Sequence, residues 1–451
     1  MNKFDDYAIQ NWGHYLEGMH ESIDPEKYVI GTYYICLASN IDPYYIGRVM
    51  VKEQTIGSFI PVTSDPKEIL RRFAGKIIGL YSTPPYEISV PDTEKERQYI
   101  IQIAYPIEGL EPQFPLLLTT LAGNISLGGK IKLLDVQFPA EFLESFKGPK
   151  FGIQGLRKQL KIPERPMLTN INHAYTIEDG MKTFYDAARG GADFIKDNES
   201  LAGDIKYLPL EERITKNMEQ VDKAKEETGE DTIYLVNITD EPTKMIDNAE
   251  KAISYGANGL MINYLTAGLA SVRTITEDPS INLPVLGHMD HAGVFYESEM
   301  SGISSNLIMG KFARMAGLDI LVYPGVYGKA PFLRDRYFAC ATVLRYPLWH
   351  LKSTLPMPAG GVTPGIVLKL IKDLGTDIMI GAGSAIHSHP KGTFAGTKAF
   401  RQIINIGVSH LEEASEDLED FIDDHKVEYP ELNVALNSWG ESGLKYLPNY
   451  L

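Results

Sequence analysis

From residue 166 onward the sequence repeats one pattern, a short apolar segment followed by a longer stretch with apolar residues at helical spacing. Leu210–Thr228 and Ile366–Gly375 are examples of the helical stretches, with charged residues on the opposite face. Eight such strand–helix pairs over about 240 residues predict a (β/α)8 barrel, the TIM-barrel architecture. The expected strands are Met167–Ile171, Phe194–Lys196, Ile233–Asn237, Gly259–Asn263, Val285–Gly287, Asp319–Tyr323, Leu355–Pro358 and Ile378–Ile380.

The residues before this repeat have no regular alternation of strands and helices. Tyr28–Cys36 and Tyr99–Tyr105 are rich in aromatic and β-branched residues, as strands are, and Asp65–Gly75 has a helical pattern. The sequence therefore predicts an α/β protein in which a smaller α+β N-terminal domain, residues 1–145, precedes the barrel, residues 146–451.

Composition restricts the partners and the compartment. The formal net charge of -16 and a pI near 5.2 argue against nucleic acid or an anionic membrane as a partner. Cys36 and Cys340 are far apart, which fits a reducing cytoplasm and gives no Cys-based zinc site. The first residues lack a signal-peptide pattern, and no stretch reaches the roughly 18 apolar residues of a membrane span, so we expect a cytoplasmic protein. The acidic run Glu412–Asp420 is expected to be a solvated helix in a C-terminal helical extension.

The second expected barrel strand ends in a cluster of polar residues. Alternation along the strand places Lys196 and Asn198 on one face, and Glu199 lies where the strand gives way to its loop. In barrels the chemistry takes place at this end of the strands. A lysine beside carboxylates is here either a reactive amine or cation site, or a buried structural ion pair, and we favour the functional interpretation.

Later strands end in further candidates. His288 and His291 follow the fifth expected strand and are either site residues or simply hydrogen-bonded loop histidines. Lys329 lies on a glycine-containing loop after the sixth strand, where a lone lysine is otherwise solvent-exposed.

The last two strands end in glycine-rich turns that run into helices. Gly360 and Gly361 follow the seventh strand, and Gly381 and Gly383 follow the eighth. Bare backbone N–H groups at such turns can bind a phosphate, although the same glycines also make tight corners. Two such turns together favour a phosphorylated ligand.

Taken together, these motifs resemble those of the ribulose-bisphosphate carboxylase (RuBisCO) superfamily. The family motif Gly-Gly-x-Asp-Phe-x-Lys-Asp-Asp-Glu is matched by Gly190–Glu199, except that Asn198 stands where the family has a metal-binding aspartate. Glu53–Phe59 is similar to the family's Glu-Ser-Ser-Thr-Gly-Thr-Trp, and Gly123–Asn124 to its substrate-contacting Gly-Asn. Gly148–Gln154 looks like the segment that opens the family's barrel.

The resemblance implies roles for individual residues. It implies catalytic roles for Lys196, Lys329, His291, Glu53 and Asn124. It also implies a homodimer, in which the N-terminal domain of one subunit completes the barrel site of its partner, and a small phosphorylated substrate. The residues that it implies for binding the substrate or its phosphate are His288, Gly360, Gly361, Gly381, Gly383, Asn170 and Asn172.

The family's strand-one lysine, which the carboxylase uses for proton transfer, is absent. Counting back from Lys196 puts Asn170 and Asn172 at the two lysine positions, although an insertion or deletion could shift this register. The arginine and histidine that hold the second phosphate are replaced by His288 and Gly287. Two further family residues, a histidine and a serine, are replaced by Val322 and Ala359.

These losses exclude a working carboxylase and instead resemble a RuBisCO-like protein of the form IV group. The implied activity is enolisation, isomerisation or decarboxylation of a phosphorylated sugar or related small acid, by proton abstraction next to a carbonyl. The alternative is a non-catalytic ligand-binding or regulatory protein that retains the fold.

The resemblance also implies a cofactor arrangement. If Lys196 is carbamylated as in the family, its new carboxylate, with Asn198 and with Glu199 or Asp197, would form a Mg²⁺ site weakened by the asparagine. If Lys196 is not carbamylated, its free amine is the first candidate for the base, provided that burial lowers its pKa, and His291 is the second.

Overall fold

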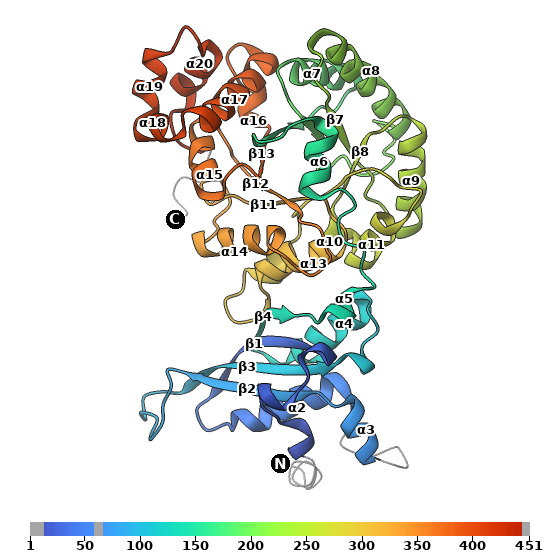
Figure 1. Cartoon of the computed structure of the whole chain (residues 1–451), viewed down its shortest axis with the longest axis vertical. Coiled ribbons are helices and arrows are strands. Elements are labelled where there is room, and N and C mark those ends of the chain that lie inside the picture. The colour runs from blue at the N-terminus through green and yellow to red at the C-terminus, as the bar shows by residue number, and fades with distance from the viewer. Residues whose placement is uncertain (1–12, 58–65, 444–451) are drawn as a thin grey trace. The chain divides into compact units, whose positions relative to one another are not determined.

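The computed structural model describes residues 13–57 and 66–443. Contacts divide the chain into two units, shown in Figure 1. One comprises Met1–Phe146 with His291–Ile308, and the other comprises Lys147–Asp290 with Met309–Leu451. The segment after the fifth barrel strand therefore belongs to the first unit, although its neighbours in sequence belong to the second.

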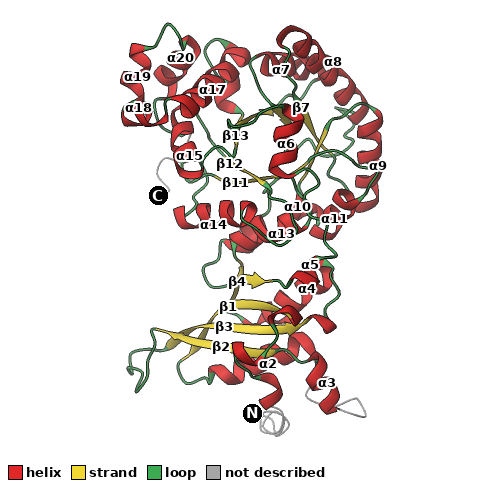
Figure 2. Ribbon diagram, viewed as in Figure 1, coloured by secondary structure: helices red, strands yellow, loops and turns green. Residues whose placement is uncertain are grey.

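The first unit is built on a five-stranded sheet with the order β10-β4-β1-β3-β2. β1 pairs antiparallel with β3 and β4, and β2 pairs antiparallel with β3, as the neighbouring strands in Figure 2 show. The short β10 runs parallel to β4. The predicted strands at Tyr28–Cys36 and Tyr99–Tyr105 are confirmed as β1 and β3, whereas β2 and β4 were not predicted. The strands are β1 (Tyr28–Ala38), β2 (Lys76–Thr83), β3 (Glu96–Pro106), β4 (Ile131–Gln137) and β10 (Gly302–Ile303).

Helices in this unit begin at clear signals in the sequence. α2 begins at Pro43, directly after Asp42, whose side chain accepts a hydrogen bond from the N–H of Tyr44. The helix expected near Asp65–Gly75 is confirmed as α3, and Ser58–Phe59 of the family-like motif lie outside the described residues. The helices are α2 (Pro43–Thr55), α3 (Pro66–Phe73), α4 (Phe114–Ala122), α5 (Ala140–Leu143) and α12 (Gly293–Tyr296).

The second unit contains an eight-stranded parallel sheet in the order β12-β11-β9-β8-β7-β6-β5-β13. β12 and β13 lie side by side, so the sheet is nearly closed into a barrel. All eight strands predicted from the sequence are present. They are β5 (Met167–Asn172), β6 (Phe194–Asp197), β7 (Ile233–Asn237), β8 (Gly259–Ile262), β9 (Val285–Gly287), β11 (Ile320–Pro324), β12 (Leu355–Ala359) and β13 (Met379–Ala382).

Alternate side chains of these strands fill the barrel interior. Met167, Phe194, Met261 and Met357 belong to one core cluster of buried residues. Three apolar residues of α6 join the same cluster, and Figure 1 shows this helix drawn over the ring of strands. This helix, which precedes the first barrel strand in the chain, therefore packs against the side chains of the barrel interior. The strand residues in this cluster face the barrel interior. Side chains alternate along a strand, so the cluster also shows which neighbouring residues face inward at the site.

Helices surround the barrel strands, and the expected helix Leu210–Thr228 is confirmed as α8. The acidic run Glu412–Asp420 was expected to be one solvated helix, and this is wrong. The helix breaks at Asp417, which caps a second helix through the N–H of Asp420, and Leu418 is buried. The helices are α6 (Gly152–Leu160), α7 (Ile177–Arg189), α8 (Leu210–Thr228), α9 (Pro242–Ser254), α10 (Tyr264–Ala267), α11 (Leu269–Glu277), α13 (Phe312–Met315), α14 (Arg334–Arg345), α15 (Val367–Leu374), α16 (Ser384–His387), α17 (Gly392–Ser409), α18 (Leu411–Glu416), α19 (Leu418–Asp424) and α20 (Pro430–Trp439).

Asp319 ties the start of α6 to the barrel. One carboxylate oxygen accepts the N–H groups of Phe151 and Gly152 at 2.6 and 2.8 Å, and the other accepts the N–H of Val285 at 3.1 Å. Burial raises the pKa of Asp319 from 3.8 to about 6, although these hydrogen bonds act in the opposite direction.

We predict that Asp319→Asn destabilises the second unit by about 1–3 kcal/mol at neutral pH, because an amide group would face a backbone donor. Since the folded pKa is the higher one, the stability contributed by protonated Asp319 is present below pH 3.8 and is lost as the pH rises through about 6. The advantage of the wild type over the variant should therefore widen as the pH is lowered through 6. Chemical denaturation of both proteins at several pH values measures this difference, and a constant difference would contradict it.

Candidate active site

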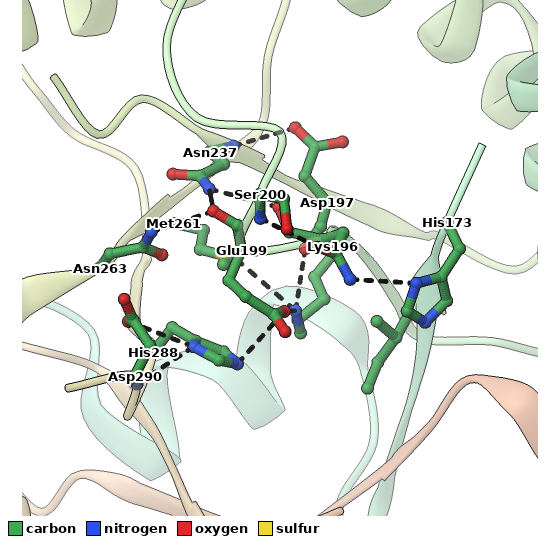
Figure 3. A network of polar contacts seen from close by, with 12 residues as sticks. His173, Lys196, Asp197, Glu199, Ser200, Asn237, Met261, Asn263, His288 and Asp290 are labelled. Carbon is green, nitrogen blue, oxygen red and sulfur yellow. Dashed lines mark hydrogen bonds and ion pairs between the residues drawn. The ribbon is translucent and has the colours of Figure 1, made fainter. Parts of the chain in front are cut away.

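Lys196 lies on β6 with its side chain inside the barrel. Its side chain is fully buried, and burial lowers the pKa of its amine, although the nearby carboxylates act in the opposite direction. Nζ donates a hydrogen bond to the backbone oxygen of Asp197 at 2.8 Å and lies 3.7 Å from Oε2 of Glu199 (Figure 3). From the sequence, Lys196 was either part of a structural ion pair or a reactive amine. The observed ion pair with Glu199 is compatible with both interpretations.

Glu199 connects Lys196 to His288. Its Oε2 lies 3.5 Å from Nε2 of His288, whose Nδ1 lies 3.3 Å from Oδ1 of Asp290. Burial alone would raise the pKa of Glu199, but nearby His288 and Lys196, together with a backbone hydrogen bond and His173, lower it. Burial lowers the pKa of His288, which favours the neutral imidazole. A continuous line of ionisable groups therefore runs from the buried amine to Asp290, as Figure 3 shows.

Asn198, two residues after Lys196, contacts His173 at the end of the neighbouring strand β5. Its amide nitrogen lies 3.0 Å from Nδ1 of His173, and its Oδ1 accepts the N–H of Ser200 at 2.9 Å. Burial lowers the pKa of His173, and His387 and Lys196 lower it further. The sequence reasoning did not select His173 as a site residue. Counting in steps of two from the buried Met167 would have found it, because this places residue 173 on the inward face.

Two asparagines hold the backbone of the same turn, and neither was selected from the sequence. The side-chain amides of Asn237 and Asn263 donate to the backbone oxygen of Glu199 at 3.2 and 3.0 Å. Both side chains are buried at the ends of neighbouring strands. These contacts orient the Glu199 carboxylate without adding charge to the site.

Asp197 points away from the barrel interior. Its carboxylate accepts hydrogen bonds from the Tyr234 hydroxyl at 2.8 Å and the N–H of Asn237 at 3.0 Å, and it pairs with Arg213 of α8 at 3.3 Å. Both charged side chains of this pair are almost completely buried. The sequence-based alternative that made Asp197 a Mg²⁺ ligand is therefore wrong, because its oxygens are directed to the helical layer.

The remaining residues do not fit a Mg²⁺ site as they are arranged. Asn198 uses its oxygen for Ser200, and Glu199 pairs with Lys196 and His288. Across residues 13–57 and 66–443, no group of three His, Cys, Asp or Glu side chains is placed to hold a metal ion. Mg²⁺ prefers about six oxygen ligands in near-octahedral geometry, so it would need a carbamate on Lys196 and a turn of Asn198.

The structure gives Asn170 and Asn172 partners in the helical layer. The Asn170 amide lies 3.3 Å from Nε2 of His387, and Oδ1 of Asn172 accepts from the N–H of Ala174 and the hydroxyl of Thr183, both at 3.1 Å. These two positions alternate with the inward ones, so the register of the first strand is shifted by one residue from the simple count. Their role as substrate contacts stays a prediction.

The loop after β11 packs against the turn after β12. The N–H of Lys329 donates to the backbone oxygen of Gly360 at 2.8 Å, and the Lys329 side chain is partly buried. Gly360 and Gly361 have φ values of +96° and +86°, a conformation that favours glycine. Close packing requires a glycine at position 381, since a Cβ there would lie 2.2 Å from the methyl carbon of Met357. Phosphate binding by these turns is a prediction that their geometry permits.

Three candidates lie in the first unit. The amide of Asn124 donates to Oε1 of Glu53 at 3.0 Å, so the structure brings together the two residues selected there. His291 is exposed, has a φ of +69°, and packs its ring edge-on against Phe295. The catalytic roles of Glu53, Asn124 and His291 stay predictions.

A nearly closed parallel barrel with a lysine–carboxylate site, joined to a small sheet domain, defines the class of this protein. The family model of the ribulose bisphosphate carboxylase large chain N-terminal domain matches residues 19–142, and that of the catalytic domain matches residues 152–439. The chain therefore belongs to the ribulose bisphosphate carboxylase large chain family. The resemblance found in the sequence motifs is confirmed.

The similar proteins include RuBisCO-like proteins and a RuBisCO. A ribulose bisphosphate carboxylase-like protein of Archaeoglobus fulgidus is 46% identical over 392 residues, which cover 86% of this chain and 90% of the relative. The 2,3-diketo-5-methylthiopentyl-1-phosphate enolase of Geobacillus thermodenitrificans is 33% identical over 366 residues, 79% of this chain and 87% of the relative. The crystal structure of a dimeric archaeal RuBisCO from Hyperthermus butylicus is similar with a TM-score of 0.82 and 26% identity, covering 95% of this chain and 99% of that one.

We predict that the unmodified chain binds Mg²⁺ weakly or not at all, because Asn198 supplies no charge and its oxygen is engaged by Ser200. Asn198→Asp adds a carboxylate beside Glu199 and should increase the affinity. Isothermal titration calorimetry of both proteins, each with and without bicarbonate to permit carbamylation, measures the difference. Tight stoichiometric binding by the unmodified chain would show that the arrangement described here is not the metal-binding one.

Proposed function

We propose that this protein abstracts a proton next to the carbonyl of a small phosphorylated ketone or sugar, and so catalyses an enolase-type reaction without carboxylation. The fully buried Lys196, held against Glu199 at a barrel strand end, is the observation that carries the proposal. The similarity to proteins named as enolases supports the same reaction type. No helix in the described part of the chain is long and apolar enough to cross a membrane.

Lys196 is the proposed base. Burial disfavours its ammonium form, and the neutral amine has the lone pair that proton abstraction requires. The proton taken from carbon would reside on Nζ, 3.7 Å from the Glu199 carboxylate, and Glu199 in turn lies 3.5 Å from His288. These contacts offer the proton a route along the line of ionisable groups. If Lys196 is instead carbamylated, its carboxylate would act as the base at the same place.

The enolate oxygen and the phosphate need positive charge or N–H donors. Lys329 is the proposed partner of the developing oxyanion, because it lies on the loop next to the Gly360 turn and is close enough to affect His173 electrostatically. The turns at Gly360–Gly361 and Gly381–Gly383 are the proposed phosphate site. One phosphate can be held in this way, which favours a monophosphate over a bisphosphate.

We predict proton exchange without carboxylation. A panel of ketose and aldose monophosphates and phosphorylated keto acids, incubated with the protein in D₂O, should lose the proton next to the carbonyl in at least one compound, as followed by proton NMR. Lys196→Ala should reduce this exchange by roughly 10²–10⁴-fold, the usual contribution of a positioned base, and Lys329→Ala should weaken it less. Carbon fixation on ribulose bisphosphate should be undetectable, because the strand-one lysine and the second phosphate clamp are missing.

Controls separate catalysis from the ligand-binding alternative. Lys196→Met preserves the bulk of the side chain and tests whether lost exchange reflects the amine, provided that its thermal unfolding matches that of the wild type. If no compound exchanges but one raises the unfolding temperature, the non-catalytic ligand-binding role becomes the better interpretation. Carboxylation of ribulose bisphosphate would show that the losses inferred from the sequence are not disabling.

We also propose a homodimer with shared active sites. The hydrogen-bonded pair of Glu53 and Asn124 supports this, because both match family residues that serve the partner's barrel. A dimeric RuBisCO among the similar structures is consistent with the same assembly.

Subunit mixing tests this arrangement. Chains carrying Glu53→Gln and chains carrying Lys196→Ala should each be inactive in the D₂O assay. Each mixed dimer would contain one site with both native residues, so an equal mixture should recover about a quarter of the wild-type exchange. Light scattering checks the dimer. No recovery after proven subunit exchange, or a monomer in solution, would contradict shared sites.

A further inference from the structure

The proposed function uses neither His173 nor Asn198, although both lie at the same strand ends as Lys196. We infer that Asn198 is a positioning residue that fixes the His173 ring, so that Nε2–H faces the glycine turn after β13 and donates a hydrogen bond to an anionic or carbonyl oxygen of the substrate. The inference deepens the proposed function and, for the role of that hydrogen bond in turnover, rests on it.

The orientation of the Asn198 amide follows from its second partner. The N–H of Ser200 donates to one end of this amide at 2.9 Å, and a backbone N–H cannot accept a hydrogen bond, so that end must be the oxygen. The NH₂ group therefore faces Nδ1 of His173 at 3.0 Å, and Nδ1 must accept. In a neutral imidazole whose Nδ1 accepts, the proton is on Nε2.

Nε2 of His173 lies close to Gly383 in the turn after β13. A Cβ built on Gly383 would lie 3.1 Å from Nε2 and 3.1 Å from Cβ of Ile171. Any side chain at residue 383 would therefore crowd the ring nitrogen. Within residues 13–57 and 66–443, no protein group hydrogen-bonds to this nitrogen, and the neighbouring His387 uses its own nitrogens for Ile171 and Thr393.

The charges around the ring suit a neutral donor. Lys196, Glu199 and Lys329 are all close enough to affect His173 electrostatically. Lys329 supplies positive charge, and Lys196 adds more once it has taken the substrate proton, so an uncharged imidazole adds direction to the hydrogen bonding without further repulsion. The ligand expected at Nε2 is an oxygen of the phosphate or of the developing enolate.

Asn198 and His173 also depend on each other chemically. A carboxylate at position 198 could only accept a hydrogen bond, so it would draw the proton of His173 to Nδ1 and leave Nε2 as an acceptor. An acceptor cannot bind an anionic oxygen. The asparagine at the family's aspartate position is therefore needed by the histidine and is more than a weakened metal ligand.

The test is the tautomer of His173, read by ¹⁵N NMR of histidine-labelled protein in the presence of a chelator. His173→Gln assigns the signal by its loss. The wild type should show a protonated Nε2 and a bare Nδ1, and Asn198→Asp should protonate Nδ1. Asn258→Asp is the matched control, since Asn258 precedes β8 at the opposite strand end and bonds to the backbone of Thr232 and Tyr234, and it should leave the His173 signal unchanged.

Two further measurements connect the tautomer to the ligand. Inorganic phosphate should shift the Nε2 signal of His173 in the wild type, and Gly383→Ala should abolish this shift. In the D₂O assay, His173→Ala and Asn198→Asp should each lower exchange by about tenfold or more.

The outcomes are distinguishable from those of the proposed function. An unchanged tautomer in Asn198→Asp would overturn the positioning role, even if Lys196-dependent exchange is observed. Wild-type exchange in His173→Ala, or no phosphate shift at Nε2, would overturn the donor role. If no compound exchanges, the proposed reaction fails, and the tautomer and phosphate measurements still decide whether His173 is a positioned anion donor.

Discussion

The buried pair of Asp197 and Arg213 sets the orientation of the whole site. Because side chains alternate along β6, fixing Asp197 in the helical layer forces Lys196 and Asn198 into the barrel. Removing one partner of such a buried pair costs about 3–5 kcal/mol, since it leaves an unpaired charge in an apolar region. The Tyr234 hydroxyl also stabilises the Asp197 carboxylate by donating a hydrogen bond to it. The polar residues at the end of β6 thus divide into Asp197, which holds the strand, and others that face the barrel interior.

The fold was predictable because its signals are local and repeated. Each barrel strand is a short apolar run, and helices such as α8 have an amphipathic period and a glycine, Gly229, at the end. The small sheet was harder. β2 contains Gly79 and is mostly partly exposed, so little in its pattern separates it from a loop. The acidic run was misread because its charge hides Leu418 and the capping role of Asp417.

Site residues that belong to one contiguous motif could be predicted from the sequence. Residues whose assignment depends on the register of another strand could not. Lys196 and Glu199 stand close together in sequence, and the structure pairs them. His173 was missed because ungapped counting from Lys196 selected Asn170 and Asn172, which face the helices. A shift of one residue exchanges the two faces of a strand, so a count across a helix and a loop is the least secure step. Asn237 and Asn263 could not be selected from the sequence for another reason. Both donate to the backbone oxygen of Glu199, and no sequence motif indicates a contact to a backbone atom.

The asparagine at position 198, a departure from the family pattern, is tied by a hydrogen bond to His173 at the end of the first barrel strand. The role proposed for His173 needs a donor at Nδ1 if its Nε2 is to donate, and Asn198 is that donor at 3.0 Å. An aspartate there would serve a metal but would turn the imidazole the wrong way. On this proposal, a metal-binding aspartate at position 198 and a neutral imidazole that donates to the substrate would exclude each other. On the proposal made above, a neutral donor after β5 takes the place of a charged metal ligand after β6, which would suit the proposed enolisation of a monophosphate better than the addition of carbon dioxide to a bisphosphate.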